Sequence, residues 1–191
     1  MSDPVAVALR AADLLESCGL RYVIGGSLAS SVSGEPRSTL DVDIVVALTD
    51  TDVSALVTAL RQEFDVDERA VTRAVRERSC VNVFHQASAI KVDLFIAGGT
   101  PLDEEQMDRR QRVRAGAAPD QYLYVYTPED ILLQKLRWFR RGNEVSDRQW
   151  RDILGILLVQ GDALEWPYLR RGADTLGVRD LLERAHAETR R

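Results

Sequence analysis

The chain has 191 residues, enough for one core domain with a helical appendage, and its apolar content of 45% is ordinary for a globular protein. No apolar run approaches the roughly 18 residues that a membrane span needs, and the first residues lack a signal-peptide pattern, so the sequence predicts a cytoplasmic protein with no membrane partner. The formal net charge is −5, with the acidic surplus in residues 1–100, so any nucleic-acid contact has to be local. Cys18 and Cys80 form no C-x-x-C pair and are expected to be reduced.

The first half of the chain alternates predicted helices with predicted strands. Asp50 and Thr51 are expected to cap one of the helices, and the polar link Gln86-Ala87-Ser88 predicts a hairpin between two β-rich runs. The helices are expected over residues 3–17, 28–32 and 53–60, and the strands over 20–24, 41–47, 81–85 and 90–96.

The second half becomes helical. Residues 102–114 are charged and favour a helix. Residues 122–126 favour one more short strand or an extended segment that leads into the next helix. Thr127 and Pro128 are typical of a helix start, and that helix is expected to reach about Arg141. Ser146 begins another helix, and the chain from there to its end is expected to be helical. The sequence thus predicts a mixed α/β core over residues 1–126 and a helical region over 127–191 that packs on the core.

Three aspartates are the strongest candidates for a metal site. Side chains alternate between the faces of a strand, so Asp41 and Asp43 point the same way while Val42 and Ile44 point into the core. Two carboxylates on one face repel each other unless a cation lies between them, and hard oxygen ligands of this kind suit Mg²⁺. Asp93 is a lone acid in another apolar strand; if the two strands are neighbours, all three carboxylates converge.

A second candidate site is the glycine break Gly25-Gly26-Ser27, which follows a strand and opens a helix. Glycines let the backbone approach a ligand closely, and a helix N-terminus offers free N–H groups to an anion such as a triphosphate. Arg37, in the loop from residue 34 to 40, is a natural additional phosphate contact.

The order and spacing of these pieces carry more information than any piece alone. G-G-S-L-A at residues 25–29, R-S-T-L-D-V-D-I-V at 37–45 and K-V-D-L-F at 91–95 together resemble the nucleotidyltransferase superfamily of the DNA polymerase β type. Within it, the pattern is most similar to the AbiEii-type toxins and the minimal nucleotidyltransferases. The resemblance implies an α+β fold class, with a nucleotidyltransferase-fold mixed sheet flanked by helices and followed by a C-terminal helical region.

The resemblance extends to two looser segments. The segment at 130–136 resembles the family's helix that carries a lysine, and the segment at 148–153 resembles its R-x-x-R-D motif, so Lys135 and Asp152 are implied as catalytic residues, with Asp147 as a rival. The alternatives are a helix-surface lysine beside Glu129 and Asp130, and an Asp152 that only pairs with the arginine one turn earlier.

The implied reaction is the transfer of a nucleoside monophosphate from an NTP to a hydroxyl group on an RNA 3′ end, a protein or a small molecule. Such transfer rests on positioning and charge neutralisation, here with two Mg²⁺ ions. The resemblance implies that Asp41 and Asp43 hold both ions, that Asp93 holds the second and helps to deprotonate the acceptor, and that Gly26 and Ser27 bind phosphates. It also raises the possibility that the chain is the toxin of a toxin–antitoxin pair with a cognate antitoxin.

Two other functions compete with this one. A non-catalytic protein of the same fold would act as an antitoxin or scaffold, but it would have no need to keep all three acids. A Rossmann-type dinucleotide binder would carry G-x-G-x-x-G and a single acid, which Gly25-Gly26-Ser27 and the paired aspartates do not match. Trp138, among arginines of the helical region, is the candidate for an RNA contact.

Overall fold

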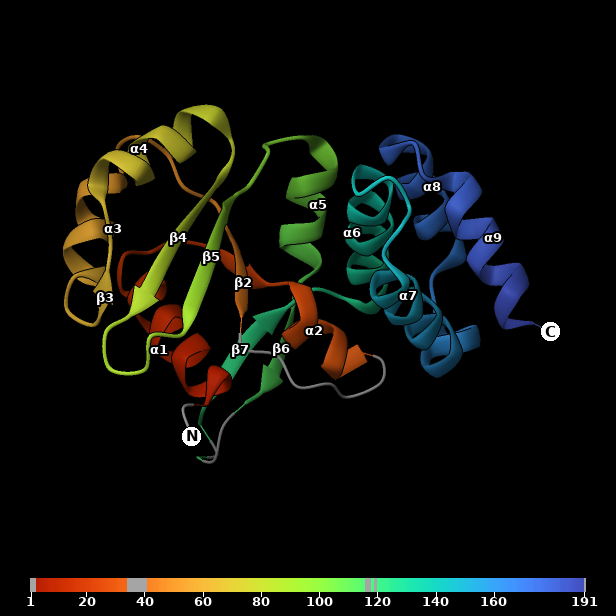
Figure 1. Cartoon of the computed structure of the whole chain (residues 1–191), viewed down its shortest axis with the longest axis horizontal. Coiled ribbons are helices and arrows are strands. Elements are labelled where there is room, and N and C mark those ends of the chain that lie inside the picture. Colours follow the sequence, from red (N-terminus) through yellow and green to blue (C-terminus); the bar gives the residue numbers. More distant parts are fainter. Residues whose placement is uncertain (1–2, 34–40, 116–117, 119, 191) are drawn as a thin grey trace. The chain divides into compact units, whose positions relative to one another are not determined.

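The computed structural model describes residues 3–33, 41–115, 118 and 120–190. The chain divides into two compact units: the first comprises Met1–Leu28 and Ser38–Val125, and the second comprises Ala29–Arg37 and Tyr126–Arg191. Among the described residues, no helix combines the length and the apolar composition that crossing a membrane requires. The elements of each unit are labelled in Figure 1.

The first unit is built on one mixed sheet. Its strands are β1 (Tyr22–Ile24), β2 (Val42–Val46), β3 (Phe64–Asp65), β4 (Cys80–His85), β5 (Lys91–Ile96), β6 (Gln111–Arg114) and β7 (Tyr122–Val125). They lie in the order β3-β4-β5-β2-β1-β7-β6. The pairs β2–β5 and β1–β7 are parallel, and the other neighbouring pairs are antiparallel. The predicted hairpin between the strands on either side of Gln86-Ala87-Ser88 is confirmed.

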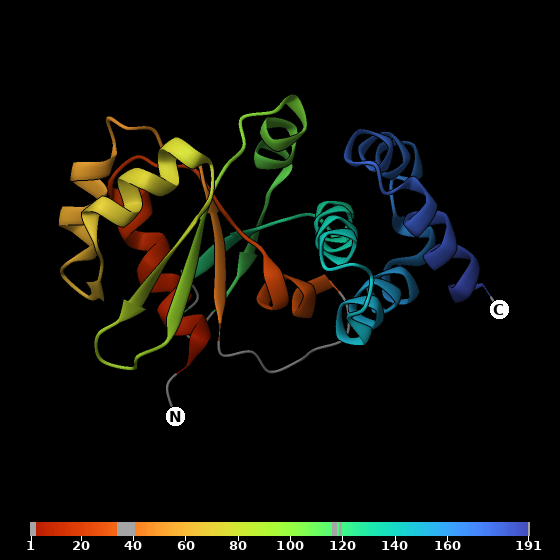
Figure 2. The ribbon, with the colours of Figure 1, turned by 45° about the horizontal axis from the view of Figure 1, so that its top comes forward.

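One face of this sheet carries the hydrophobic core. Helices α1 (Pro4–Ser17), α3 (Val53–Leu60) and α4 (Glu68–Glu77) lie together on one side of the strands (Figure 2). Beneath them the side chains of Val42, Ile44 and Val46 are fully buried, while Asp43 and Val45, which alternate with them, are only partly buried. The predicted alternation is therefore confirmed, and Asp43 belongs to the face opposite the core.

Two segments of the first unit differ from the sequence-based expectation, and a third had no expectation. The cap of α3 is Asp52, whose carboxylate accepts hydrogen bonds from Thr49 instead of from its own helix, so neither Asp50 nor Thr51 caps it. The helix predicted over 102–114 is shorter in the structure. Helix α5 spans Pro101–Arg109, and the chain then continues as the edge strand β6. Strand β3 and helix α4 lie in a stretch for which the sequence made no prediction.

The second unit is helical among its described residues. After α2 (Gly26–Ser33), which starts in the first unit, it contains α6 (Pro128–Arg141), α7 (Asp147–Gln160), α8 (Trp166–Leu176) and α9 (Arg179–Thr189). Thr127 caps α6 as predicted, and the carboxylate of Asp130 accepts from its hydroxyl at 2.9 Å. Asp130 is fully buried and also accepts from the Tyr168 hydroxyl, which fastens α8 to the first turn of α6.

Candidate functional site

The sheet register brings two of the predicted acids side by side. Strands β2 and β5 pair in parallel so that Asp43 lies directly opposite Asp93. Residues opposite each other in a ladder share a face, so both carboxylates project from the side that α1, α3 and α4 leave uncovered. Asp41 precedes Asp43 by two residues at the entrance of β2 and is exposed. The two strands are therefore neighbours, which is the condition under which the sequence predicted that the acids converge.

Asp41, Asp43 and Asp93 together are called the acid row, and the glycine break contacts this row at Asp43. Gly26 has a φ of +55°, a left-handed conformation that suits glycine, and a β-carbon there would lie 1.7 Å from Oδ2 of Asp43. The Gly25 amide donates to the backbone carbonyl of Asp43 at 2.9 Å. The first turn of α2, with Ser27 partly buried, is thus joined to the Asp43 end of β2.

Two further side chains engage Asp93. Asn82, opposite it on β4, donates a hydrogen bond from Nδ2 to Oδ1 of Asp93. Lys91, two residues before it on β5, places its Nζ 2.8 Å from Oδ2 of Asp93 and 3.7 Å from Oδ1 of Asp41. Both carboxylate oxygens of Asp93 are therefore engaged, and its side chain is only 13% exposed. The hydrogen bond to Asp93 raises the pKa of Lys91, which favours the charged ammonium.

Neither Asn82 nor Lys91 was predicted from the sequence as a site residue. A signal existed for Lys91, because the two-residue period of a strand places it on the face of Asp93. For Asn82 the signal was weaker, because its position depends on the exact register of the hairpin.

The arrangement suits a hard cation in ligand type but is held around an ammonium group. Among the described residues, no three His, Cys, Asp or Glu side chains come close enough together to bind a metal ion. The Lys91 ammonium instead stands between Asp41 and Asp93 as a cation would. Carboxylate oxygens are of the ligand type that Mg²⁺ prefers, at about 2.0–2.1 Å. Asp41, Asp43 and Asp93 are the residues that would hold it.

The negative field of this row reaches a neighbouring thiol. Cys80 lies on β4 opposite Phe95, on the same face as Asn82. Burial, and then the charges of Asp93 and Asp43, raise the pKa of this thiol to about 11. Both cysteines are free, as expected from the sequence.

The second unit joins the other two predicted residues to each other. Nζ of Lys135 on α6 lies 2.8 Å from Oδ2 of Asp152 on α7, and the two side chains are 11% and 15% exposed. Asp147, the rival acid, is exposed at the first turn of α7. Lys135 is therefore not a free surface lysine, and Asp152 is its ion-pair partner.

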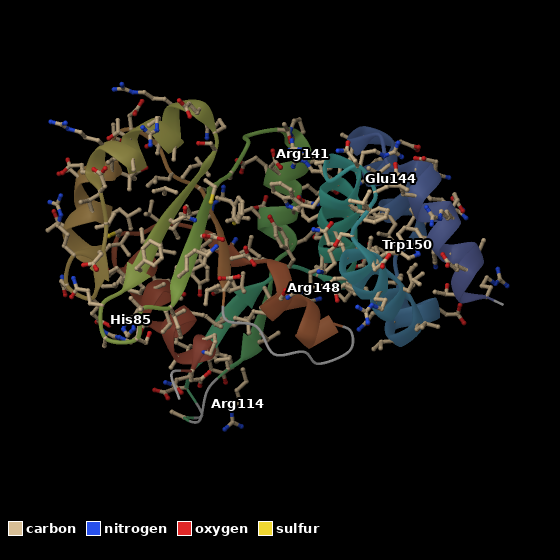
Figure 3. The ribbon with its side chains drawn as sticks, viewed as in Figure 1. His85, Arg114, Arg141, Glu144, Arg148 and Trp150 are labelled. Atoms are coloured by element: carbon tan, nitrogen blue, oxygen red, sulfur yellow. The ribbon has the colours of Figure 1, made fainter. Side chains whose placement is uncertain are left out.

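Basic residues gather on the β6–β7 hairpin and the helices. The Arg112 guanidinium stacks on Tyr122 at 4.0 Å from the ring centroid, and Arg114 points away from the rest of the sheet (Figure 3). In the second unit, Arg141 lies 5.3 Å from the ring centroid of Trp138, whose side chain is exposed. Arg37, the predicted phosphate contact, lies outside the described residues.

No family model matches the chain, and a search of curated proteins finds no match to its sequence. The fold can instead be compared with solved structures. It combines a mixed sheet, flanking and trailing helices, and acids on one face of the sheet.

Those comparisons find the nucleotidyltransferase fold. An antigenic nucleotidyltransferase-like protein from Paracoccidioides brasiliensis superposes with a TM-score of 0.56 and 20% identity over 95% of this chain and 90% of the other. ANT(2″)-Ia in complex with adenylyl-2″-tobramycin gives 0.58 and 10% over 92% and 97%. The lincosamide antibiotic adenylyltransferase LnuA, with lincomycin bound, gives 0.50 and 14% over 82% and 96%. The chain has the fold of the nucleotidyltransferase superfamily, as the sequence motifs indicated.

Proposed function

We propose that the protein transfers a nucleoside monophosphate from an NTP to a hydroxyl group of an acceptor, with release of pyrophosphate. The observation that carries this proposal is the acid row, in which Asp43 lies opposite Asp93 on the sheet face away from α1, α3 and α4, and against Gly26 at the start of α2. The nucleotidyltransferase fold supports it independently.

In the proposed reaction, the acceptor oxygen forms a bond to the α-phosphorus and the bond to the pyrophosphate oxygen breaks. Asp93 takes up the acceptor proton, and Asp41 with Asp43 orients the triphosphate against Gly26 and Ser27 in the first turn of α2, because a helix N-terminus favours an anion. Bound Mg²⁺ supplies neutralisation of the phosphate charge. Lys135 and Asp152 pair with each other in the second unit, and a catalytic role for them stays a prediction of the sequence.

We propose a small molecule as the acceptor. Two of the solved structures with this fold contain a nucleotidylated antibiotic or a bound antibiotic. An RNA 3′ end is less favoured, because the overall charge of −5 gives no broad electrostatic attraction to a polyanion. A protein hydroxyl acceptor, and a role as a toxin with a cognate antitoxin, stay predictions of the sequence.

The test is nucleotide binding that depends on the acids. ATP, and then CTP, GTP and UTP, are titrated calorimetrically into the protein with and without Mg²⁺. We expect binding that needs the cation and weakens about tenfold or more, or about 1.4 kcal/mol, in Asp43→Asn. Asp13→Asn is the matched control: it removes the same charge from the exposed surface of α1, on the opposite side of the sheet, and should bind as the wild type does.

A positive result leads to an assay of pyrophosphate release with panels of hydroxylated small molecules, short RNAs and proteins. If no NTP binds at millimolar concentration, the enzymatic proposal is wrong, and the non-catalytic alternative, a scaffold or antitoxin of the same fold, takes its place.

A further inference from the structure

Lys91 occupies an unusual position in the acid row. It begins β5 two residues before Asp93, so both side chains lie on the same face of the sheet. Its ammonium bridges Oδ2 of Asp93, at 2.8 Å, and Oδ1 of Asp41, at 3.7 Å. The side chain of Lys91 is 35% exposed, so water reaches it, whereas that of Asp93 is 13% exposed.

The choice of lysine at this position stands out against the rest of the sequence. The chain has 25 basic residues, of which only Lys91 and Lys135 are lysines. An ammonium is a compact point charge on a flexible four-carbon stem, whereas a guanidinium is a rigid planar fork. Lysine is thus the basic side chain that most closely imitates a small cation and that leaves a site with the least rearrangement.

The contacts of Asp93 show what Lys91 prevents. Oδ1 of Asp93 accepts from Asn82 and Oδ2 accepts from Lys91. A divalent cation near Oδ2 would meet the ammonium charge at short range, and the hydrogen bond from that ammonium makes the oxygen a weaker base for an acceptor proton. Displacement of the Lys91 ammonium would remove both effects.

We propose that Lys91 is an internal counter-ion that keeps the carboxylates of the acid row together without a metal ion and is displaced when a divalent cation binds. The proposal rests on the proposed function, because it takes the acid row as the cation site. It assigns Lys91 a positioning role: its charge opposes binding of the cation and stabilises the protein in the absence of the cation.

The first test is cation affinity in the full-length protein, measured with Mn²⁺ by electron paramagnetic resonance and calorimetry without nucleotide. Removing a unit charge next to a divalent cation is expected to tighten binding about tenfold in Lys91→Met. Lys91→Arg keeps the charge and should bind Mn²⁺ no more tightly than the wild type.

The matched control is Arg112→Met, which also removes one positive charge. Arg112 lies on β6, four strands from β5 in the sheet order, or about 19 Å at the usual strand spacing. That exceeds the screening length of about 10 Å in 0.1 M salt, so its Mn²⁺ affinity should not change.

The second test follows the lysine itself. Reductive methylation with ¹³C-formaldehyde labels the two lysine side chains, and the Lys91 signal is identified by its loss in Lys91→Met. Mg²⁺ should shift that signal toward the position of a solvated dimethyl-lysine in the wild type but not in Asp43→Asn.

A third test measures thermal stability without cations. Lys91→Met should unfold at a lower temperature than the wild type, and Lys91→Met/Asp93→Asn should recover part of the loss.

The outcomes separate this inference from the function on which it rests. If Mn²⁺ binds the wild type and Lys91→Met equally well, or binds Lys91→Met more weakly, the displacement proposal is wrong while the cation site stands. If Mn²⁺ binds neither protein nor Asp43→Asn, the acid row is not a cation site, and both proposals are overturned.

Discussion

At the scale of single residues, the contact between Gly26 and Asp43 is the most restrictive feature of the candidate site. Gly26 has a left-handed backbone, and the space that a β-carbon would need is filled by the Asp43 carboxylate. The absence of a side chain therefore lets the start of α2 and the acid row lie in contact. Glycine is required at this position for two reasons, conformational and steric.

Gly26→Ala should therefore lose more stability than backbone strain alone explains. Gly19→Ala is the matched control, because Gly19 is also left-handed, with φ of +70°, but has nothing within 4 Å of the added carbon. We expect Gly19→Ala to cost about 1 kcal/mol of unfolding free energy and Gly26→Ala to cost about 1–3 kcal/mol more, measured by urea denaturation.

The same pair of variants tests the site. Gly26→Ala should weaken metal-dependent NTP binding by displacing the Asp43 carboxylate, and Gly19→Ala should leave it unchanged. Equal stability losses in the two variants would contradict the close contact, whatever happens to nucleotide binding.

At the scale of elements, an ion pair fastens α1 to the turn before β3. The Arg10 guanidinium donates to both carboxylate oxygens of Glu63, and Nε contributes the longer bond at 3.0 Å. Hydrogen bonding from Arg10 lowers the pKa of Glu63 below its ordinary value. A carboxyl group whose pKa is lower in the folded state than in the unfolded state stabilises the fold above its unfolded pKa and loses that contribution as the pH falls through its folded pKa.

Glu63→Gln should therefore reduce the unfolding free energy only at pH values where the carboxylate is ionised. Because Arg10 is half exposed, we expect a loss of about 0.2–1 kcal/mol at pH 7. The difference from the wild type should disappear as the pH falls below the folded pKa of Glu63. Urea denaturation between pH 7 and pH 3 measures it.

Glu77→Gln serves as the control for this pH series. Glu77 is exposed at the end of α4, and no described basic side chain pairs with it. The unfolding free energy of Glu77→Gln should stay close to that of the wild type at every pH. A Glu63→Gln deficit that persists at pH 3 would mean that the side chain contributes by packing and not by charge.

The elements that the sequence predicted well are those with a clear hydrophobic period and a strong cap. Helix α6, between Thr127 and Gly142, and the alternating strand β2 are examples. Strand β6 was predicted as helix because its sequence, Q-R-V-R, is charged, and only its pairing with Tyr122–Val125 makes it a strand. β-structure depends on such neighbours more than helix does.

At the scale of the whole molecule, the chain forms two units, each with its own hydrophobic core. Leu56 of α3 is fully buried in the first unit, and Leu132 of α6 is fully buried in the second. All three tryptophans lie in residues 138–166, so tryptophan fluorescence reports on the second unit.

Core substitutions should therefore act on one unit at a time. We expect Leu132→Ala to lower the unfolding free energy followed by tryptophan fluorescence by about 2–5 kcal/mol. Leu56→Ala should leave that transition unchanged and reduce the hydrogen-exchange protection of the β2 and β5 amides. If both variants shift the fluorescence transition equally, the two units unfold as one cooperative structure.

The sequence by itself determined the nucleotidyltransferase fold class and the residues that chemistry would need. Asp41 and Asp43 share a strand face because the two-residue period is local, and the glycine break is visible as adjacent letters. Only the tertiary structure decided that β2 and β5 are neighbours, with Asp43 opposite Asp93 and Asn82 across the hairpin. Strand order and register depend on contacts between segments far apart in the chain, which no local pattern records. The same holds for one of the two contacts of Lys91: Asp93 is its neighbour on β5, but Asp41 comes near its ammonium only because β2 and β5 pair.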